Sequence, residues 1–289
     1  MYGNESNPIY LLPTFQSARG GGHEEGIRIK SRPAHHTLFP PSRRFTLMHI
    51  ILRWQANQKA SRMKILAFNA SPRKSQGTTD ILMEAFIEGA RKADAEVEKH
   101  YVVDLDIRGC LGCFTCWWKT PGKCVHRDDM EWVLPRIIEA DILLLGTPIY
   151  GRNTTHYMQR LLERTFSLTL PEMRVKDGET THPTRPHKSL QLVLCATCGF
   201  PDVSNFNHVR ALYPTAVQIL LPSAQILLND SGREYLSDFL EATSLTGQKM
   251  ADGEEIPASL ADRLVVEYSD EMKKIIIDAH NQYSASRIE

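Results

Sequence analysis

From residue 63 onward, short apolar runs alternate along the chain with longer stretches in which apolar residues recur every three or four positions. The apolar runs are too short for helices and do not alternate with polar residues, so we interpret them as buried strands. These predicted strands cover residues 63–69, 141–146, 190–196 and 224–228, and we interpret residues 97–105 as the second strand in chain order. Helical spacing covers residues 78–92, 128–139, 154–168 and 209–220, and residues 231–283 read as helices broken near 252–253 and 256–257.

This alternation predicts an α/β fold. Strands that alternate with helices form a parallel sheet covered on both faces. Five such strands fit the flavodoxin-like doubly wound sheet, with strand order 2-1-3-4-5. We expect residues 63–230 to form this domain and residues 231–289 to be its C-terminal helical extension. Because such sheets bind ligands beyond the carboxyl ends of their strands, the loops after the strands are the candidate sites.

Residues 1–62 differ in composition from the remainder. They contain five glycines, five prolines, nine basic and three acidic residues, and no sustained apolar period. Such a segment buries too little apolar surface to offset the entropy of ordering it. We expect a disordered basic leader, or a stretch upstream of a start at Met63; the alternative is a basic arm that binds a partner.

Overall composition excludes two classes of protein. The chain has 289 residues with 34 basic and 34 acidic side chains, which argues against binding to nucleic acid through a basic field. No apolar run approaches the roughly 18 residues that a membrane span needs. We therefore expect a cytoplasmic protein with neither nucleic-acid nor membrane partners.

The loop after the first predicted strand brings hydroxyl groups and positive charge to the start of a helix. Hydroxyl donors, an arginine, helix amides and a glycine that permits close approach are what a phosphate monoester requires. Neither the GxxxxGK[ST] loop nor the GxGxxG fingerprint is present, and the plainer alternative is a hydroxyl-rich helix cap. The candidate phosphate-binding residues are Ser71, Arg73, Ser75, Gly77, Thr78 and Thr79.

Four of the six cysteines lie within fifteen residues, in the loop 110–124. They are Cys110, Cys113, Cys116 and Cys124. Thiols this close in a chain without secretory features rarely form a disulfide framework, and they suit coordination of zinc or an iron-sulfur cluster. Free or redox-active thiols are the third alternative. The carboxylates of Asp128 and Asp129 follow this loop, where they suit the cap and dipole of the next helix.

The remaining two cysteines, Cys195 and Cys198, form a C-x2-C pair at the end of the fourth predicted strand. One interpretation is a redox pair of the thioredoxin type. The favoured interpretation is that Cys195 is a small apolar core residue, while Cys198 begins the loop after the strand.

The loops after the first, third and fourth strands together resemble those of the NADPH-dependent FMN reductases in the flavodoxin-like superfamily. Ser71-Pro72-Arg73 followed by Gly77-Thr78-Thr79 is similar to the family's FMN-phosphate loop. The resemblance implies flavin contacts from two further loops, at Pro148, Ile149, Tyr150 and Gly151 and at Thr197, Cys198 and Gly199. The cysteine spacing and Asp128-Asp129-Met130 resemble the iron-sulfur flavoprotein branch, which implies a [4Fe-4S] cluster on Cys110, Cys113, Cys116 and Cys124.

This resemblance implies an enzyme in which FMN carries the chemistry, so no side chain is assigned a catalytic role. The chain is expected to take hydride from NADPH or NADH and to pass electrons, through the cluster, to a ferredoxin-like protein or a small-molecule acceptor. A homodimer or homotetramer is implied as well. The alternatives are a flavodoxin-type electron carrier, a cluster-free NAD(P)H:quinone or flavin reductase, and a zinc-bound scaffold without flavin.

Overall fold

The computed structural model describes residues 62–176, 178–185 and 189–287, so the predicted leader lies outside the described residues except for Arg62. The strands are β1 (Lys64–Asn69), β2 (Glu96–Tyr101), β3 (Ile142–Pro148), β4 (Arg174–Lys176), β5 (Glu179–Thr181), β6 (Gln191–Thr197) and β7 (Val217–Leu221). The helices are α2 (Thr78–Lys92), α3 (Thr115–Trp118), α4 (Met130–Glu139), α5 (His156–Arg164), α6 (Asn207–Leu212), α7 (Asp230–Tyr235), α8 (Ser237–Ala251), α9 (Ala258–Ala261) and α10 (Asp270–Ala285). In these ranges no helix is both long and apolar enough to cross a membrane.

Five of these strands form one parallel sheet with the order β2-β1-β3-β6-β7. Numbered along the chain, this is the predicted order 2-1-3-4-5, so the α/β class and the topology are confirmed. The chain winds outward in both directions from the junction of β1 and β3. The loops that follow these two strands therefore diverge and leave room for a ligand at their carboxyl ends.

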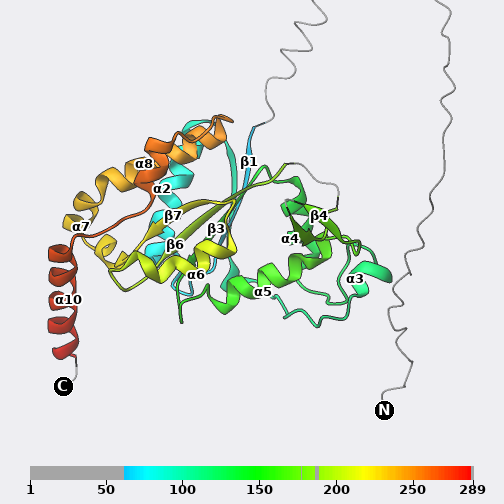
Figure 1. Cartoon of the computed structure of the whole chain (residues 1–289), viewed down its shortest axis with the longest axis horizontal. Coiled ribbons are helices and arrows are strands. Elements are labelled where there is room, and N and C mark those ends of the chain that lie inside the picture. Colours follow the sequence, from blue (N-terminus) through cyan, green and yellow to red (C-terminus); the bar gives the residue numbers. More distant parts are fainter. Residues whose placement is uncertain (1–61, 177, 186–188, 288–289) are drawn as a thin grey trace, which may run out of the picture. The chain divides into compact units, whose positions relative to one another are not determined.

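Helices cover both faces of the sheet (Figure 1). Successive residues of β3 alternate between two apolar clusters, Ile142 and Leu144 in one and Leu143 and Leu145 in the other. The first cluster includes α2 and α8, and the second includes α4, α5 and α6. This two-sided burial explains why the strands read as continuous apolar runs.

Helices α2 and α8 cross at two glycines. A Cβ atom added at Gly89 of α2 would lie 1.7 Å from the carbonyl oxygen of Ser244 in α8. A Cβ atom added at Gly247 of α8 would lie 2.0 Å from the carbonyl oxygen of Phe86 in α2. The two backbones are thus packed against each other, and the predicted C-terminal extension contributes directly to the core.

Two predicted elements in the region 209–228 are wrong. The predicted helix over 209–220 is the short α6 followed by strand β7, because Pro214 cannot continue the helix. The predicted strand over 224–228 is a 3-10 turn, η5 (Ala224–Leu228), which follows Ser223 in the left-handed conformation with φ of 45°. The fifth strand of the sheet therefore lies seven residues earlier than predicted.

Several boundaries also move. The second predicted strand ends at Tyr101 and continues as the 3-10 turn η2 (Val102–Asp104), and the helix predicted to end at residue 168 becomes the 3-10 turn η3 (Thr165–Leu168) after Arg164. The other short turns are η1 (Lys74–Gln76), η4 (Val203–Phe206) and η6 (Asp262–Leu264). The antiparallel hairpin β4–β5 lies outside the main sheet and was not predicted.

The two edges of the sheet are protected differently. At one edge, β2 reads EVEKHY and has no fully buried residue. At the other edge, the residues after η6 lie beside β7. The Val266 amide donates a hydrogen bond to the Leu220 carbonyl at 3.2 Å, and Val265 forms a parallel β-bridge with Leu220. Charged side chains protect the β2 edge, and backbone hydrogen bonding protects part of the β7 edge.

The last helix, α10, has no buried residue. Ser269 caps its start by accepting a hydrogen bond from the Met272 amide, and Lys273 pairs with Asp202 at 3.4 Å. Ile275 and Ile277 stay about half exposed. The helix is therefore held by few contacts to the described chain, unlike α8.

Candidate functional site

The three predicted loops meet at the carboxyl ends of β1, β3 and β6, where they line a cavity of about 410 Å³. This volume lies within the usual range for small-molecule sites, roughly 300–1,000 Å³. All predicted cofactor-binding residues except Ser75 and Gly151 line the cavity. They are Ser71, Arg73, Gly77, Thr78, Thr79, Pro148, Ile149, Tyr150, Thr197, Cys198 and Gly199.

The first loop is fixed by a buried polar network at the end of β1. The Asn69 side chain donates to Asp80 at 2.8 Å and accepts from the Ser71 amide at 2.8 Å. Asp80 in turn pairs with Lys99 of β2. Burial alone lowers the pKa of Lys99, but hydrogen bonds and attraction from Asp80 and Glu84 outweigh it and hold the pKa above its usual value. Side-chain contacts within the chain therefore hold the start of this loop.

The glycine of this loop lies close against the Ser71 side chain. A Cβ atom at Gly77 would lie 2.8 Å from the Ser71 hydroxyl oxygen, which itself accepts the Arg73 amide at 3.3 Å. Thr78 and Thr79 begin α2 directly after Gly77, so their backbone amides are at the positive end of the helix dipole. Ser75 is exposed on η1 and does not line the cavity.

The second loop turns tightly after Tyr150. Gly151 and Arg152 both have positive φ, 57° and 65°, and Tyr150 and Asn153 exchange backbone hydrogen bonds at 2.9 and 3.1 Å. These are the features of a type I′ turn. The turn leaves the Tyr150 ring about half exposed at the cavity. Gly151 lines a neighbouring cavity instead.

The third loop is tied to the first by a buried contact between the hydroxyls of Thr79 and Thr197 at 2.8 Å. Cys198 lines the cavity, and burial raises the pKa of its thiol to about 11 despite hydrogen bonds with the Phe200 and Ser223 backbone. Cys195 is fully buried in the core, and burial raises the pKa of its thiol as well. Both thiols are free, and their raised pKa values are the opposite of what a reactive thiol needs.

Some residues at this cavity were missed by the sequence analysis. Ala224 and Gln225 come from η5, and His280 and Tyr283 come from α10. A second cavity of about 620 Å³ adjoins the first and shares Ile149, Cys198, Gly199, Gln225 and His280 with it. Nothing in the sequence near residue 280 indicates this placement, since α10 follows β6 by more than seventy residues.

The cysteine loop follows β2 and η2 in the chain. Cys110 and Cys113 are exposed, while Cys116 and Cys124 are half buried. Burial raises the pKa of Cys116, and the neighbouring Cys124, Cys110 and Cys113 raise it further, so the other three thiols lie near Cys116. Among the described residues, however, no three histidine, cysteine or acidic side chains are placed as a metal-binding group.

Aromatic side chains support this loop from one side. Trp117 of α3 is buried and stacks on Phe166 with ring centroids 4.5 Å apart, and its indole nitrogen donates to Thr169 at 3.2 Å. Trp118 stays exposed. The middle of the cysteine loop is thus anchored to the segment that follows α5.

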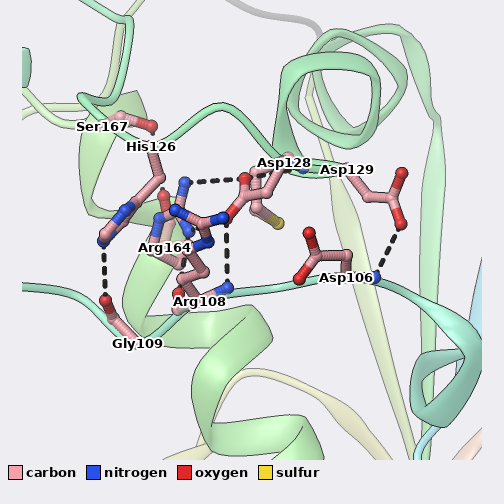
Figure 2. A network of polar contacts seen from close by, with 9 residues as sticks. Asp106, Arg108, Gly109, His126, Asp128, Asp129, Arg164 and Ser167 are labelled. Atoms are coloured by element: carbon pink, nitrogen blue, oxygen red, sulfur yellow. Dashed lines mark hydrogen bonds and ion pairs between the residues drawn. The ribbon is translucent and has the colours of Figure 1, made fainter.

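The two aspartates after the loop differ in their role at the start of α4: Asp128 accepts a hydrogen bond from the amide of Met130, the first residue of the helix, at 3.2 Å. Asp129 precedes α4 without a side-chain cap bond; it accepts instead from the Asp106 amide at 2.7 Å and the Trp132 indole at 3.0 Å. Asp128 forms a buried ion pair with Arg164 at 2.6 Å (Figure 2). Both side chains therefore fix the polypeptide on either side of the cysteines.

Comparison with known proteins places this arrangement in context. Residues 63–180 match the NADPH-dependent FMN reductase family. An iron-sulfur flavoprotein of Archaeoglobus fulgidus is 34% identical over 115 residues, or 40% of this chain and 55% of the relative. An iron-sulfur flavoprotein of Methanocaldococcus jannaschii is 30% identical over 117 residues, or 40% of this chain and 59% of the relative. The chain thus spans little more than half the length of these curated relatives.

A solved structure supports the fold independently. The NAD(P)H:quinone oxidoreductase from Methanothermobacter marburgensis superposes with a TM-score of 0.50 at 14% identity, covering 66% of this chain and 98% of the other. At this identity the likeness concerns the fold alone.

Proposed function

We propose that the chain is an FMN-dependent oxidoreductase, because residues 63–180 match the NADPH-dependent FMN reductase family. It takes hydride from NADPH or NADH and passes the electrons to an acceptor. The observation that carries the proposal is the single cavity lined by all three predicted loops. The loop after β1 lines one part of this cavity with hydroxyl groups and the positive charge of Arg73. The loops after β3 and β6 line the rest with backbone and apolar groups.

The cavity residues fit FMN by their chemistry. The Ser71, Thr78 and Thr79 hydroxyls and the Arg73 guanidinium would hold the phosphate, and Gly77 keeps the space beside Ser71 free of a side chain. Residues 148–150 and 197–199 would hold the ring. FMN, when bound, supplies the hydride chemistry. The adjoining 620 Å³ cavity offers room beside the same residues for the nicotinamide or the acceptor.

We further propose that Cys110, Cys113, Cys116 and Cys124 hold a [4Fe-4S] cluster. Four thiol donors in one loop, three of which lie close enough to the fourth to raise the pKa of Cys116, are the donor set that such a cluster uses. A cluster would supply one-electron transfer beside the two-electron chemistry of the flavin. The acceptor would then be a ferredoxin-like protein or a small oxidant.

A cluster-free NAD(P)H:quinone or flavin reductase is the second candidate. It is favoured by the placement of the cysteine side chains, which within the described residues do not converge on a metal position. A homo-oligomer is proposed for either candidate, because α10 leaves Ile275 and Ile277 half exposed.

The first test is the content of FMN, iron and acid-labile sulfide per chain, in protein purified without oxygen and then mixed anaerobically with NADPH or NADH. Bleaching of bound FMN with about four iron and four sulfide per FMN would support the cluster-bearing oxidoreductase. FMN that bleaches in protein without iron would leave the cluster-free reductase. FMN that does not bleach with either nicotinamide, or a chain that binds no FMN, would refute the oxidoreductase.

A further inference from the structure

The ion pair between Arg164 and Asp128 is almost completely buried, with 1% and 0% of the two side chains exposed. The guanidinium and the carboxylate meet as a fork, Nη1 to Oδ2 at 2.6 Å and Nη2 to Oδ1 at 3.0 Å (Figure 2). Burial alone raises the pKa of Asp128, but hydrogen bonds from Arg164 and the Arg108 amide hold it below its usual value. The pair is therefore charged, and both oxygens of its carboxylate accept hydrogen bonds.

This pair joins the two ends of the cysteine loop. Asp128, four residues after Cys124, accepts a hydrogen bond from the Arg108 amide at 3.0 Å. Arg164 donates through Nη1 to the Arg108 carbonyl at 2.8 Å. Both backbone groups of the residue two positions before Cys110 are thus held by one ion pair, which closes the base of the loop.

Arg164 also has an unused donor beside a cysteine. Its Nε is buried and meets no hydrogen-bond acceptor within the described part of the chain. The same guanidinium interacts with the Cys124 side chain. Arg164 and Cys124 line one cavity of about 360 Å³ together with Lys123 and Arg185. An anionic sulfur at Cys124 would therefore face positive charge and a free N–H.

Helix α5 carries this arginine from the flavin side of the fold. At its start Thr155 donates to the Ala70 carbonyl at 3.0 Å and accepts from the Met158 amide, so the helix begins against the end of β1. Arg164 is its last residue. One nine-residue helix thus spans from the candidate flavin cavity to the base of the cysteine loop.

A buried ion pair is weak evidence for a role beyond the fold, because well-packed apolar residues often replace one without loss of stability. Three features here go beyond what packing requires. The ion pair binds both the amide and the carbonyl of Arg108 at the base of the cysteine loop. The Nε–H of Arg164 has no acceptor within the described residues, and the guanidinium to which it belongs interacts with Cys124.

We propose that Arg164 is a positioning residue for the cysteine loop: it closes the base of the loop through Asp128 and presents its Nε–H to the sulfur of Cys124. The proposal rests on the proposed function, in which Cys124 is a cluster ligand. Outer hydrogen bonds orient metal ligands, and donors to sulfur raise the reduction potential of iron-sulfur clusters. Arg164 is therefore expected both to retain the cluster and to raise its potential.

Two variants of the full chain test this role. Arg164→Lys keeps the positive charge but removes the planar fork and the Nε–H. The double variant Arg164→Met with Asp128→Leu replaces the pair by apolar side chains and guards against misfolding by an unpaired buried charge. The matched control is Arg160→Lys. Arg160 lies one turn earlier in α5, its Nε is also buried without a hydrogen-bond partner among the residues that the structure describes, and its guanidinium lies over the Tyr157 ring.

The readouts separate this role from folding. With FMN content unchanged, release of iron to a chelator should be about 10-fold or more faster in both Arg164 variants than in Arg160→Lys, the lower bound for loss of an outer ligand partner. The midpoint potential of the cluster, followed by electron paramagnetic resonance, should fall in both. In metal-free protein, hydrogen exchange at the Arg108 amide should accelerate in the double variant, while the Asp106 amide held by Asp129 keeps its protection.

Each outcome decides a different question. Iron retained equally by the unmodified chain and the Arg164 variants, at an unchanged potential, would refute the role of Arg164 and leave the proposed function standing. A chain that binds FMN but takes up no iron in any form would refute the cluster itself, and with it this role.

Discussion

The crossing of α2 and α8 provides the most direct test of the packing. The change is Gly89→Ala, which adds one methyl group at the point where α2 faces the Ser244 carbonyl. Backbone atoms cannot rotate away as a side chain can. The added atom would lie 1.7 Å from an oxygen, whereas real Cβ atoms essentially never approach within 3.0 Å. The two helices must therefore separate by more than an ångström or bend.

The expected magnitude combines two opposing effects. Overpacking of a well-filled site costs typically 1–3 kcal/mol, and a contact with rigid backbone belongs at the upper end. Alanine is a better helix former than glycine by about 1 kcal/mol, which offsets part of that cost. We expect the free energy of unfolding to fall by about 2 kcal/mol. For a domain of this size that lowers Tm by roughly 4–8 °C.

The assay is urea unfolding followed by far-ultraviolet circular dichroism, with thermal unfolding as a second measurement. The control is Glu88→Ala, which introduces the same residue one position earlier on the exposed side of α2 and should stay within about 0.5 kcal/mol of wild type. Gly247→Ala should behave like Gly89→Ala, and the double variant should lose less than the sum, because the first methyl already separates the helices. If Gly89→Ala is as stable as Glu88→Ala, close backbone contact between these helices does not contribute to the fold.

Three further predictions concern the cavity. Thr197→Val should lower the free energy of unfolding by about 1–3 kcal/mol, because it leaves the buried Thr79 hydroxyl without its partner; Thr197→Ser keeps the hydroxyl, and an equal loss in both would contradict this reason. Cys198 should resist iodoacetamide at pH 8 in the native protein, as judged by mass spectrometry, since burial raises its pKa to about 11. The unfolded thiol ionises near pH 8.5, so Cys198 should also make thermal stability fall as pH rises from about 9 toward 11; rapid native alkylation at pH 8 would refute both statements. Arg73→Ala should weaken FMN binding about 10- to 100-fold in a fluorescence titration, the loss of one hydrogen bond to a charged group, whereas Arg91→Ala, at the far end of α2, should leave it unchanged.

The order of the sheet was predictable because four of its five strands could be located in the sequence, where they alternate with helical segments. The fifth was not. Residues 217–221 read VQILL and residues 224–228 read AQILL, yet the first is strand β7 and the second a 3-10 turn. Pairing with β6 selects the first segment, and the left-handed Ser223 turns the chain away before the second. Such a choice depends on tertiary context more than on local preference.

The candidate site was predictable to the extent that it follows strand ends. The loops after β1, β3 and β6 converge because the carboxyl ends of parallel strands share one edge, and residues in all three loops carried a signal. Nothing in the sequence indicated that His280 and Tyr283 line the cavity, because their position depends on the path of α10. The sequence indicated Asp128 and Asp129 as helix caps, and Asp128 does accept from the Met130 amide at the start of α4. The other partners of these carboxylates, Arg164 and the Asp106 amide, lie at positions that local sequence does not reveal.

The unlike edges of the sheet bear on how copies of this chain can associate. An open edge strand invites another chain to extend the sheet, the usual route to aggregation through backbone pairing. On β2 the side chains of Glu96, Glu98 and Lys99 would bring charge into any such pairing, and Glu98 is already engaged by Arg136 at 2.8 Å. On β7, Val265 and Val266 occupy part of the edge from within the chain. Self-assembly by continuous sheet is therefore disfavoured, and orderly association is left to helical surfaces such as the apolar side of α10.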